Sequence, residues 1–167
     1  MAIAAAANLA TVMALPRLIN AVVLHRMAQL AGGANRALPA PRADASARAV
    51  VRPSPDLLYT VCVFDVSERP LHIAAPVQDS YVSVSGFAAD TDNFFAINDA
   101  ELAPGPDGVK RFDLVVAGPG ALDAAPGARV ITAPSARGLI LFRSLITRDS
   151  ELPRLREFQA RQECAPL

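Results

Sequence analysis

The stretch from Asp79 to Asp99 (DSYVSVSGFAADTDNFFAIND) constrains the fold of this chain more than any other. Two runs of β-branched and aromatic residues flank a polar turn rich in Asp and Asn, a pattern typical of a β-hairpin. Other short apolar runs follow at regular intervals, and 14 prolines and nine glycines separate them. Because no helical periodicity intervenes, the chain is expected to be mainly β, an antiparallel β-sandwich.

The expected strands flank this hairpin on both sides. The run Leu57–Val66 is apolar on both faces, which predicts a buried central strand. A helix is expected at the end of the chain, with Ser150 as its N-cap and Pro153 in its first turn. Its inward stripe would consist of Leu152, Leu155 and Phe158, with Gln159 beside them. The remaining predicted strands are Leu71–Ala75, Arg111–Ala117, Arg129–Ala133 and Leu139–Thr147.

Residues 1–30 form an apolar segment in front of this domain. Residues 1–16 carry no charged side chain, and the apolar run resumes after Arg17. A helix of this length can cross about 30 Å of hydrocarbon, with the Arg17 side chain reaching the surface. Ala31-Gly32-Gly33 would end it. We favour a single-pass transmembrane helix in the inner membrane; a cleaved signal peptide and a soluble amphipathic helix packed on the domain are the alternatives.

Residues 31–55, rich in Ala, Pro and Arg, predict an extended linker before a sandwich domain at residues 56–167. Five arginines and a single aspartate lie within the first 50 residues. By the positive-inside rule these charges would keep the domain in the cytoplasm, but large domains are translocated regardless, so the sidedness stays open. The net charge of the whole chain is zero, so no nucleic-acid partner is predicted.

The chain has two cysteines, too few for a disulfide framework or a zinc site. Cys62 lies in a predicted strand and should be buried, whereas Cys164, near the C-terminus, is expected to be exposed. A bridge between them would require an oxidising compartment, and their number alone does not decide it. The turn Asp90–Asn93 lacks the ligand pattern of a calcium loop. We therefore predict no metal and no cofactor.

No complete catalytic constellation is present. There is no G-x-S-x-G motif, and neither His25 nor His72 has a partner at metal-ligand spacing. Arg143 is notable because it interrupts the apolar run LILFRSLIT, where a charge must pair with an acid or reach solvent. The candidate ligand-binding residues are Arg52, Asp56, Tyr59, Asp90, Asn93 and Arg143.

Two hypotheses for the function follow. The first is a membrane-anchored module of the cell envelope that binds a small molecule or a partner protein, which the lack of a catalytic constellation favours over an enzyme. The alternative is a hydrolase that uses carboxylates and Arg143 in a pocket of the sandwich.

Residues 52–163 resemble the bacterial family catalogued as domain of unknown function 1254. The segments that carry the resemblance are RPSPDLLYTVCVFDV, DSYVSVSGF, TDNFFAIN, FDLVVAGPG, GLILFRSLIT and ELPRLREFQARQE. The resemblance implies an antiparallel β-sandwich, in a short, membrane-anchored branch without the downstream domain of unknown function 1214 that many members carry. Full-length members often have asparagine and arginine before the strand tyrosine, where this chain has Pro-Ser-Pro-Asp before Leu57. The resemblance implies no activity.

Overall fold

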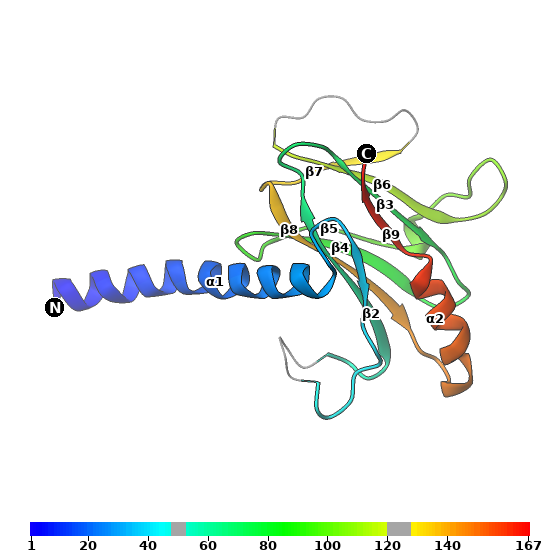
Figure 1. Cartoon of the computed structure of the whole chain (residues 1–167), viewed down its shortest axis with the longest axis horizontal. Helices are drawn as coiled ribbons and strands as arrows, with labels where there is room; N and C mark the ends of the chain where they lie inside the picture. Colours follow the sequence, from blue (N-terminus) through cyan, green and yellow to red (C-terminus); the bar gives the residue numbers. More distant parts are fainter. Residues whose placement is uncertain (48–52, 120–127) are drawn as a thin grey trace.

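The chain folds into a two-sheet sandwich with a long helix at its N-terminal end (Figure 1). The structure is a computed structural model that describes residues 1–47, 53–119 and 128–167. Two short 3₁₀ turns, η1 (Asp99–Glu101) and η2 (Asp149–Glu151), complete the regular structure of this part of the chain. The helices and strands are α1 (Ala2–Leu30), β1 (Ala37–Pro39), β2 (Leu57–Asp65), β3 (Leu71–Pro76), β4 (Val82–Ala88), β5 (Asn93–Asn98), β6 (Arg111–Ala117), β7 (Arg129–Thr132), β8 (Arg137–Leu145), α2 (Leu152–Ala160) and β9 (Glu163–Pro166).

One sheet has five strands in the order β1-β2-β8-β4-β5, and the other has four in the order β7-β6-β3-β9. The predicted hairpin is confirmed, since β4 and β5 pair antiparallel with Val84 opposite Ile97. The strand β8, rather than β2, is central to the five-stranded sheet. One pair differs from the antiparallel expectation: β7 runs parallel to β6. Residues 120–127, between these two strands, lie outside the described part.

The core lies between the two sheets and is built by alternation along the strands. Side chains that point into the sandwich are fully buried, with Phe64, Phe112 and Phe142 the largest among them. The opposite face of β2 is only half-buried, at Tyr59 and Val61 for example. Burial on one face produces the period of two that is visible in strands such as β4 (VSVSGFA).

Gly86 explains how the hairpin fits two aromatic rings under one strand. A Cβ built on Gly86 would lie 2.3 Å from the Phe95 ring and 2.7 Å from the Phe94 ring. The two rings pack edge to face with their centroids 5.1 Å apart. The hairpin therefore packs two half-buried aromatic rings against the core, and the glycine makes room for them.

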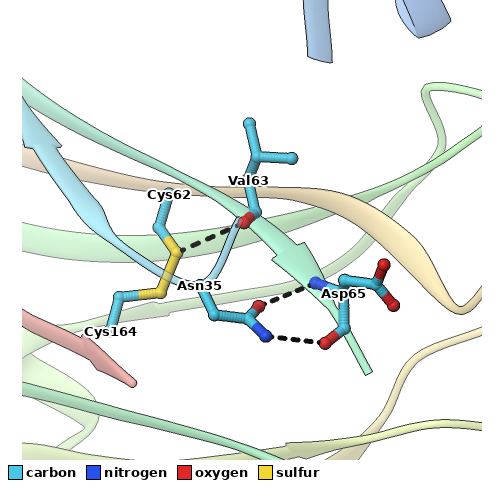
Figure 2. The surroundings of a disulfide bond; sticks show 5 residues. All are labelled: Asn35, Cys62, Val63, Asp65 and Cys164. Atoms are coloured by element: carbon cyan, nitrogen blue, oxygen red, sulfur yellow. Dashed lines mark hydrogen bonds between the residues drawn. A yellow bond between two sulfur atoms is a disulfide. The ribbon is translucent and has the colours of Figure 1, made fainter. Parts of the chain in front are cut away.

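A disulfide bond between Cys62 and Cys164 joins the two sheets (Figure 2). Cys62 lies on β2 and Cys164 on β9, with their Cα atoms 6.5 Å apart, within the range that disulfides span. The expectation that Cys164 is exposed was wrong: its residue is 6 % exposed. The four residues of β9 carry no strand signal in the sequence, but pairing with β3 places Cys164 inside the sandwich.

Residues 35–39 of the predicted linker are bound to the sandwich. Figure 2 shows Asn35 donating from its amide to the Asp65 carbonyl (2.8 Å) and accepting from the Asp65 amide (2.7 Å). Asn35 adopts φ 59°, a conformation that asparagine tolerates. The strand β1 follows at once and pairs with β2 through Leu38 and Val61.

Helix α1 is continuous through Pro16 and ends where the glycines predict, with Gly32 at φ 75°. Its C-terminal third contacts the sandwich: the Asn20 side chain donates to the Ala89 carbonyl at 2.8 Å, and Leu24 is buried. The part before Asn20 projects away from the sandwich (Figure 1), and its apolar side chains are exposed.

Helix α2 differs from its prediction at the start and on its inward face. Ser150 is part of η2, so the helix begins at Leu152 and its N-cap is Glu151. Leu155 is buried as expected, whereas Phe158 is half-buried, with the Arg161 guanidinium 4.6 Å from its ring centroid. Gln159 takes the inward place, because its amide satisfies two carbonyls at the edge of the sheet, Tyr59 O (2.7 Å) and Ala40 O (3.0 Å).

Candidate functional site

A cavity of about 600 Å³ lies where α1 meets the sandwich. Its apolar walls come from α1 and β2, including Leu24 and Val63. Its polar wall combines both signs of charge and a hydroxyl: Arg17, His25, Asp65, Asp90, Ser135 and Arg137. A cavity with apolar walls and a few converging polar groups is the usual form of a ligand site.

Four separate segments bring these side chains together. Asp65 ends β2, Asp90 follows β4, and Ser135 and Arg137 lie at the start of β8. The register explains the convergence, because Arg137 is opposite Asp65 on one side of β8 and Gly138 is opposite Ala88 on the other. Helix α1 then crosses this end of the sheet and adds Arg17 and His25.

Asp65 is the most constrained charge in the cavity wall. Its carboxylate accepts from the Arg137 Nε at 2.7 Å, the Ser67 hydroxyl at 2.5 Å and the Ser67 amide at 3.1 Å. Burial of the side chain, which is 21 % exposed, acts to raise the pKa of Asp65. The hydrogen bonds from Ser67 and the Arg137 charge outweigh it and lower the pKa below its ordinary value.

We expect Asp65→Asn to lower the free energy of unfolding by roughly 1 kcal/mol at pH 7, because a half-buried carboxylate loses charge-assisted bonds and its exposed partner is screened by solvent. The folded-state pKa is depressed, so this contribution is complete above the unfolded pKa of about 4 and is lost as the pH falls through the folded pKa. Urea unfolding at pH 7 and pH 3 measures it. The difference in unfolding free energy between wild type and variant should be smaller at pH 3 than at pH 7. A difference of the same size at both pH values would contradict the expectation.

The candidate residues from the sequence fall into separate places. Arg52 lies outside the described residues. Asp56 is exposed, and its backbone carbonyl accepts from the Ile146 amide at 2.8 Å. The Tyr59 hydroxyl accepts from the Ser54 amide at 3.0 Å. These contacts hold the entry to β2.

Arg143 lies directly across from Tyr59 in the register of β2 and β8. It is half-buried and donates from Nη1 to the Ser85 hydroxyl at 3.1 Å. In the part of the chain that the structure describes, no carboxylate lies within ion-pair distance of it. The arginine is therefore held by a serine of the neighbouring strand β4, and the paired acid that a hydrolase site would need is not beside it.

The two residues of the hairpin turn separate as well. Asp90 lines the cavity at α1, whereas the Asn93 amide donates to the Gly86 and Phe95 carbonyls, each at 3.0 Å. Tyr59 and Asp65 are six residues apart on β2, about 20 Å along the strand. Asp90 therefore does not share a site with Tyr59 and Arg143.

Sequence reasoning missed five polar residues of this cavity: Arg17, His25, Asp65, Ser135 and Arg137. Each stands at the end of a strand, in a turn or on α1, and nothing local in the sequence marks their convergence. One signal was available: Asp65 ends an apolar strand and lies two residues before Ser67, a spacing at which an Asp side chain accepts from a nearby backbone amide.

A second cavity, of about 370 Å³, lies between the start of β4 and α2. Its charged side chains are already paired with one another. Arg154 contacts Asp79 at 3.4 Å, and Arg148 contacts Glu151 at 3.3 Å. We therefore regard the cavity at α1 as the candidate site. Neither cavity holds a metal-type cluster: within residues 1–47, 53–119 and 128–167, no three His, Cys, Asp or Glu side chains are grouped closely enough to hold an ion.

The family of the chain follows from its sequence over the whole sandwich. The model of the family described as "Protein of unknown function (DUF1254)" matches residues 34–166. The chain belongs to the DUF1254 family. The match begins one residue before Asn35, so the DUF1254 region includes β1 and the Asn35 contact to β2. No curated protein sequence matches the chain.

Two solved structures share the DUF1254 fold of this chain. The crystal structure of the VPA0106 protein from Vibrio parahaemolyticus matches 91 % of this chain, with a TM-score of 0.67 and 13 % identity. A putative uncharacterized protein from Burkholderia cenocepacia matches 72 %, with a TM-score of 0.51 and 17 % identity. The chain spans about a third of the length of each, 35 % and 34 %. The Vibrio structure matches 91 % of this chain, which is more than residues 34–167 make up, so the match extends into α1.

Proposed function

We propose that this DUF1254 protein is a membrane-anchored binding module. In this proposal α1 crosses the membrane, the sandwich stands at the membrane surface in an oxidising compartment, and the cavity at the foot of α1 takes a small ligand. The observation that carries the proposal is the state of α1: it is the one helix in the described residues long and apolar enough to cross a membrane, and none of its most apolar stretch is buried against the sandwich.

The length of the free part of α1 supports the anchor. Ala2–Ile19 precedes the first contact with the sandwich, and 18 helical residues extend about 27 Å, close to the thickness of the hydrocarbon layer. The large apolar side chains of this part are exposed, among them Leu9, Val12 and Leu15. A soluble helix of this kind would expose a large apolar surface to water.

Arg17 stands at the end of this free part. Its Nη1 donates to the Met13 carbonyl at 2.7 Å, so a backbone carbonyl of the same helix satisfies one of its donors. An arginine near the end of a membrane helix can keep its charge at the level of the head groups. The cavity, which Arg17 lines, would then lie at the membrane surface.

The disulfide supports a location of the sandwich outside the cytoplasm. Disulfide bonds persist in oxidising compartments and are rare in the cytosol. Cys62 and Cys164 are bonded and buried between the sheets, so the bond is part of the core and must form before or during folding. We therefore place the sandwich on the non-cytoplasmic side, against the bias of the arginines that follow the apolar run.

Extraction of membranes from cells that express the full chain tests the anchor. We expect the chain to stay with the membrane pellet after alkaline carbonate, which strips peripheral proteins, and to be released by detergent. A peripheral membrane protein serves as the control for stripping. Recovery of the full chain in the soluble fraction without detergent would reject the anchor.

A further inference from the structure

The charges in the cavity at α1 are arranged by sign. Two cationic or ionisable side chains, Arg17 and His25, come from α1, and the acids Asp65 and Asp90 come from the sandwich. Arg137 joins the acids, where it neutralises Asp65 through their ion pair at 2.7 Å. The cavity is therefore close to neutral overall, but it is cationic on its helix side and acidic on its sandwich side.

Some of these groups are free to bind a ligand. Asp65 has three donors from Ser67 and Arg137, whereas the Asp90 carboxylate accepts a single bond in the described residues, a 3.3 Å contact from the Asp92 amide. The His25 side chain makes no hydrogen bond or ion pair within the described residues. Arg17 uses one of its five donors on Met13. The unused capacity is thus an arginine on α1, a histidine eight residues further along the same helix, and a carboxylate on the sandwich.

The order of these groups along α1 matches the order of groups in a phospholipid. Asn20 is bonded to the Ala89 carbonyl, which places Asp90 near the level of Asn20 on the helix. The Arg17 Cα lies three residues nearer the membrane end, about 4.5 Å along the axis, and its guanidinium bonds the Met13 carbonyl, further toward that end. A phosphate beside Arg17 and an amine beside Asp90 would therefore be separated by a short spacer, with the phosphate on the membrane side.

We propose that this cavity binds the head group of a zwitterionic phospholipid with a primary ammonium, of the phosphatidylethanolamine type. Arg17 receives the phosphate, and Asp90 receives the ammonium through a charge-assisted hydrogen bond. This inference rests on the proposed anchoring of α1, which places the cavity at the head-group level.

Native mass spectrometry of the full chain in detergent tests the proposal. The chain is offered equal amounts of phosphatidylethanolamine, phosphatidylcholine, whose trimethylated nitrogen has no N–H donor, and phosphatidylglycerol, which has no ammonium. We expect phosphatidylethanolamine to be retained about tenfold over either of the others, the size of one charge-assisted bond. Equal retention of the three lipids would overturn the proposal.

Two variants separate the roles of the charges, each with a matched control. Asp90→Asn should abolish the preference for phosphatidylethanolamine, whereas Asp92→Asn, on the same turn but outside the cavity wall, should keep it. Arg17→Gln should reduce retention of all three lipids, whereas Arg26→Gln, on the same helix but not lining the cavity, should not. An unchanged preference in Asp90→Asn would overturn the assignment of the ammonium.

Soluble phosphoethanolamine distinguishes a lipid from a free ligand. If the proposal is right, it competes weakly and retention of the lipid persists at equal concentration. Binding of phosphoethanolamine without retention of the lipid would overturn the lipid and assign the cavity to a free zwitterion. Binding of phosphoethanolamine can also be measured if carbonate extraction shows that α1 is no anchor. Failure of the membrane anchor and failure of the ligand site are therefore distinguishable.

Discussion

Replacing Cys62 and Cys164 together with alanine is expected to lower the free energy of unfolding by about 4 kcal/mol, the effect of opening a loop of this length. The two cysteines are 102 residues apart and link opposite sheets, so the bond restricts most of the sandwich in the unfolded chain. Because a domain of this size has a total stability of about 5–15 kcal/mol, the variant should be only marginally folded. Denaturant unfolding of the detergent-solubilised chain measures the loss.

The wild-type chain under a strong reductant is the matched control, since it loses the bond without losing an atom from the core. Its stability should fall to within about 1 kcal/mol of the double variant, the residual difference reflecting the small cavities that alanine leaves. Equal midpoints for the oxidised and reduced chain would show that the bond does not stabilise the sandwich.

The second large effect is expected in α1. Leu9→Asp with Val12→Asp should move the chain from the membrane to the soluble fraction, because each aspartate near the centre of a membrane helix costs about 2.5–3.5 kcal/mol of insertion free energy. Both side chains are exposed and lie before Asn20, so the sandwich should fold as before. Quantitative fractionation, with circular dichroism of the soluble product, measures both effects.

The apolar pair Leu9→Val with Val12→Leu controls for changes at these positions, and it should stay with the membrane. If the double aspartate variant remained membrane-bound to the same degree as this control, the free part of α1 would not be the anchor. Unfolding of the sandwich in the aspartate variant would instead show that this part of α1 is needed for folding.

The elements that the sequence predicted are those whose signal is local. The Asp79–Asp99 hairpin has β-branched and aromatic residues on both arms and turn residues between them, and it forms as β4 and β5. Helix α1 ends at the glycines that permit a left-handed conformation. The strand β9 escaped prediction because its four residues are held by pairing with β3 and by the Cys62 bond, neither of which leaves a pattern in adjacent residues.

The candidate site was predictable to a smaller degree for the same reason. Asp90 could be nominated because an acidic turn is visible in the sequence, and it does line the cavity. Its neighbours Arg17 and Arg137 come from positions 73 residues before it and 47 after it. The pairing of β4 with β8 brings Arg137 close, and the docking of α1 against this end of the sheet adds Arg17. Nothing in the spacing of these residues along the sequence predicts that docking. Arg143 was notable as a charge in an apolar run, and a serine on β4 accounts for it.

Two features of the chain favour opposite sides of the membrane for the sandwich. The arginines after the apolar run favour retention of the sandwich in the cytoplasm, whereas a buried disulfide favours an oxidising compartment. We give more weight to the disulfide because it is part of the core, while the charge bias has little influence on the translocation of large domains. The account therefore depends on a membrane-bound sandwich whose cysteines are oxidised.

Maleimide labelling of the full chain, with a C-terminal tag, in intact spheroplasts tests this directly. We predict that the chain is membrane-bound, that external protease removes the tag without lysis, and that Cys62 and Cys164 react with maleimide only after denaturation and reduction. A tag that is protected until lysis, on a chain whose denatured cysteines react without reductant, would contradict the account.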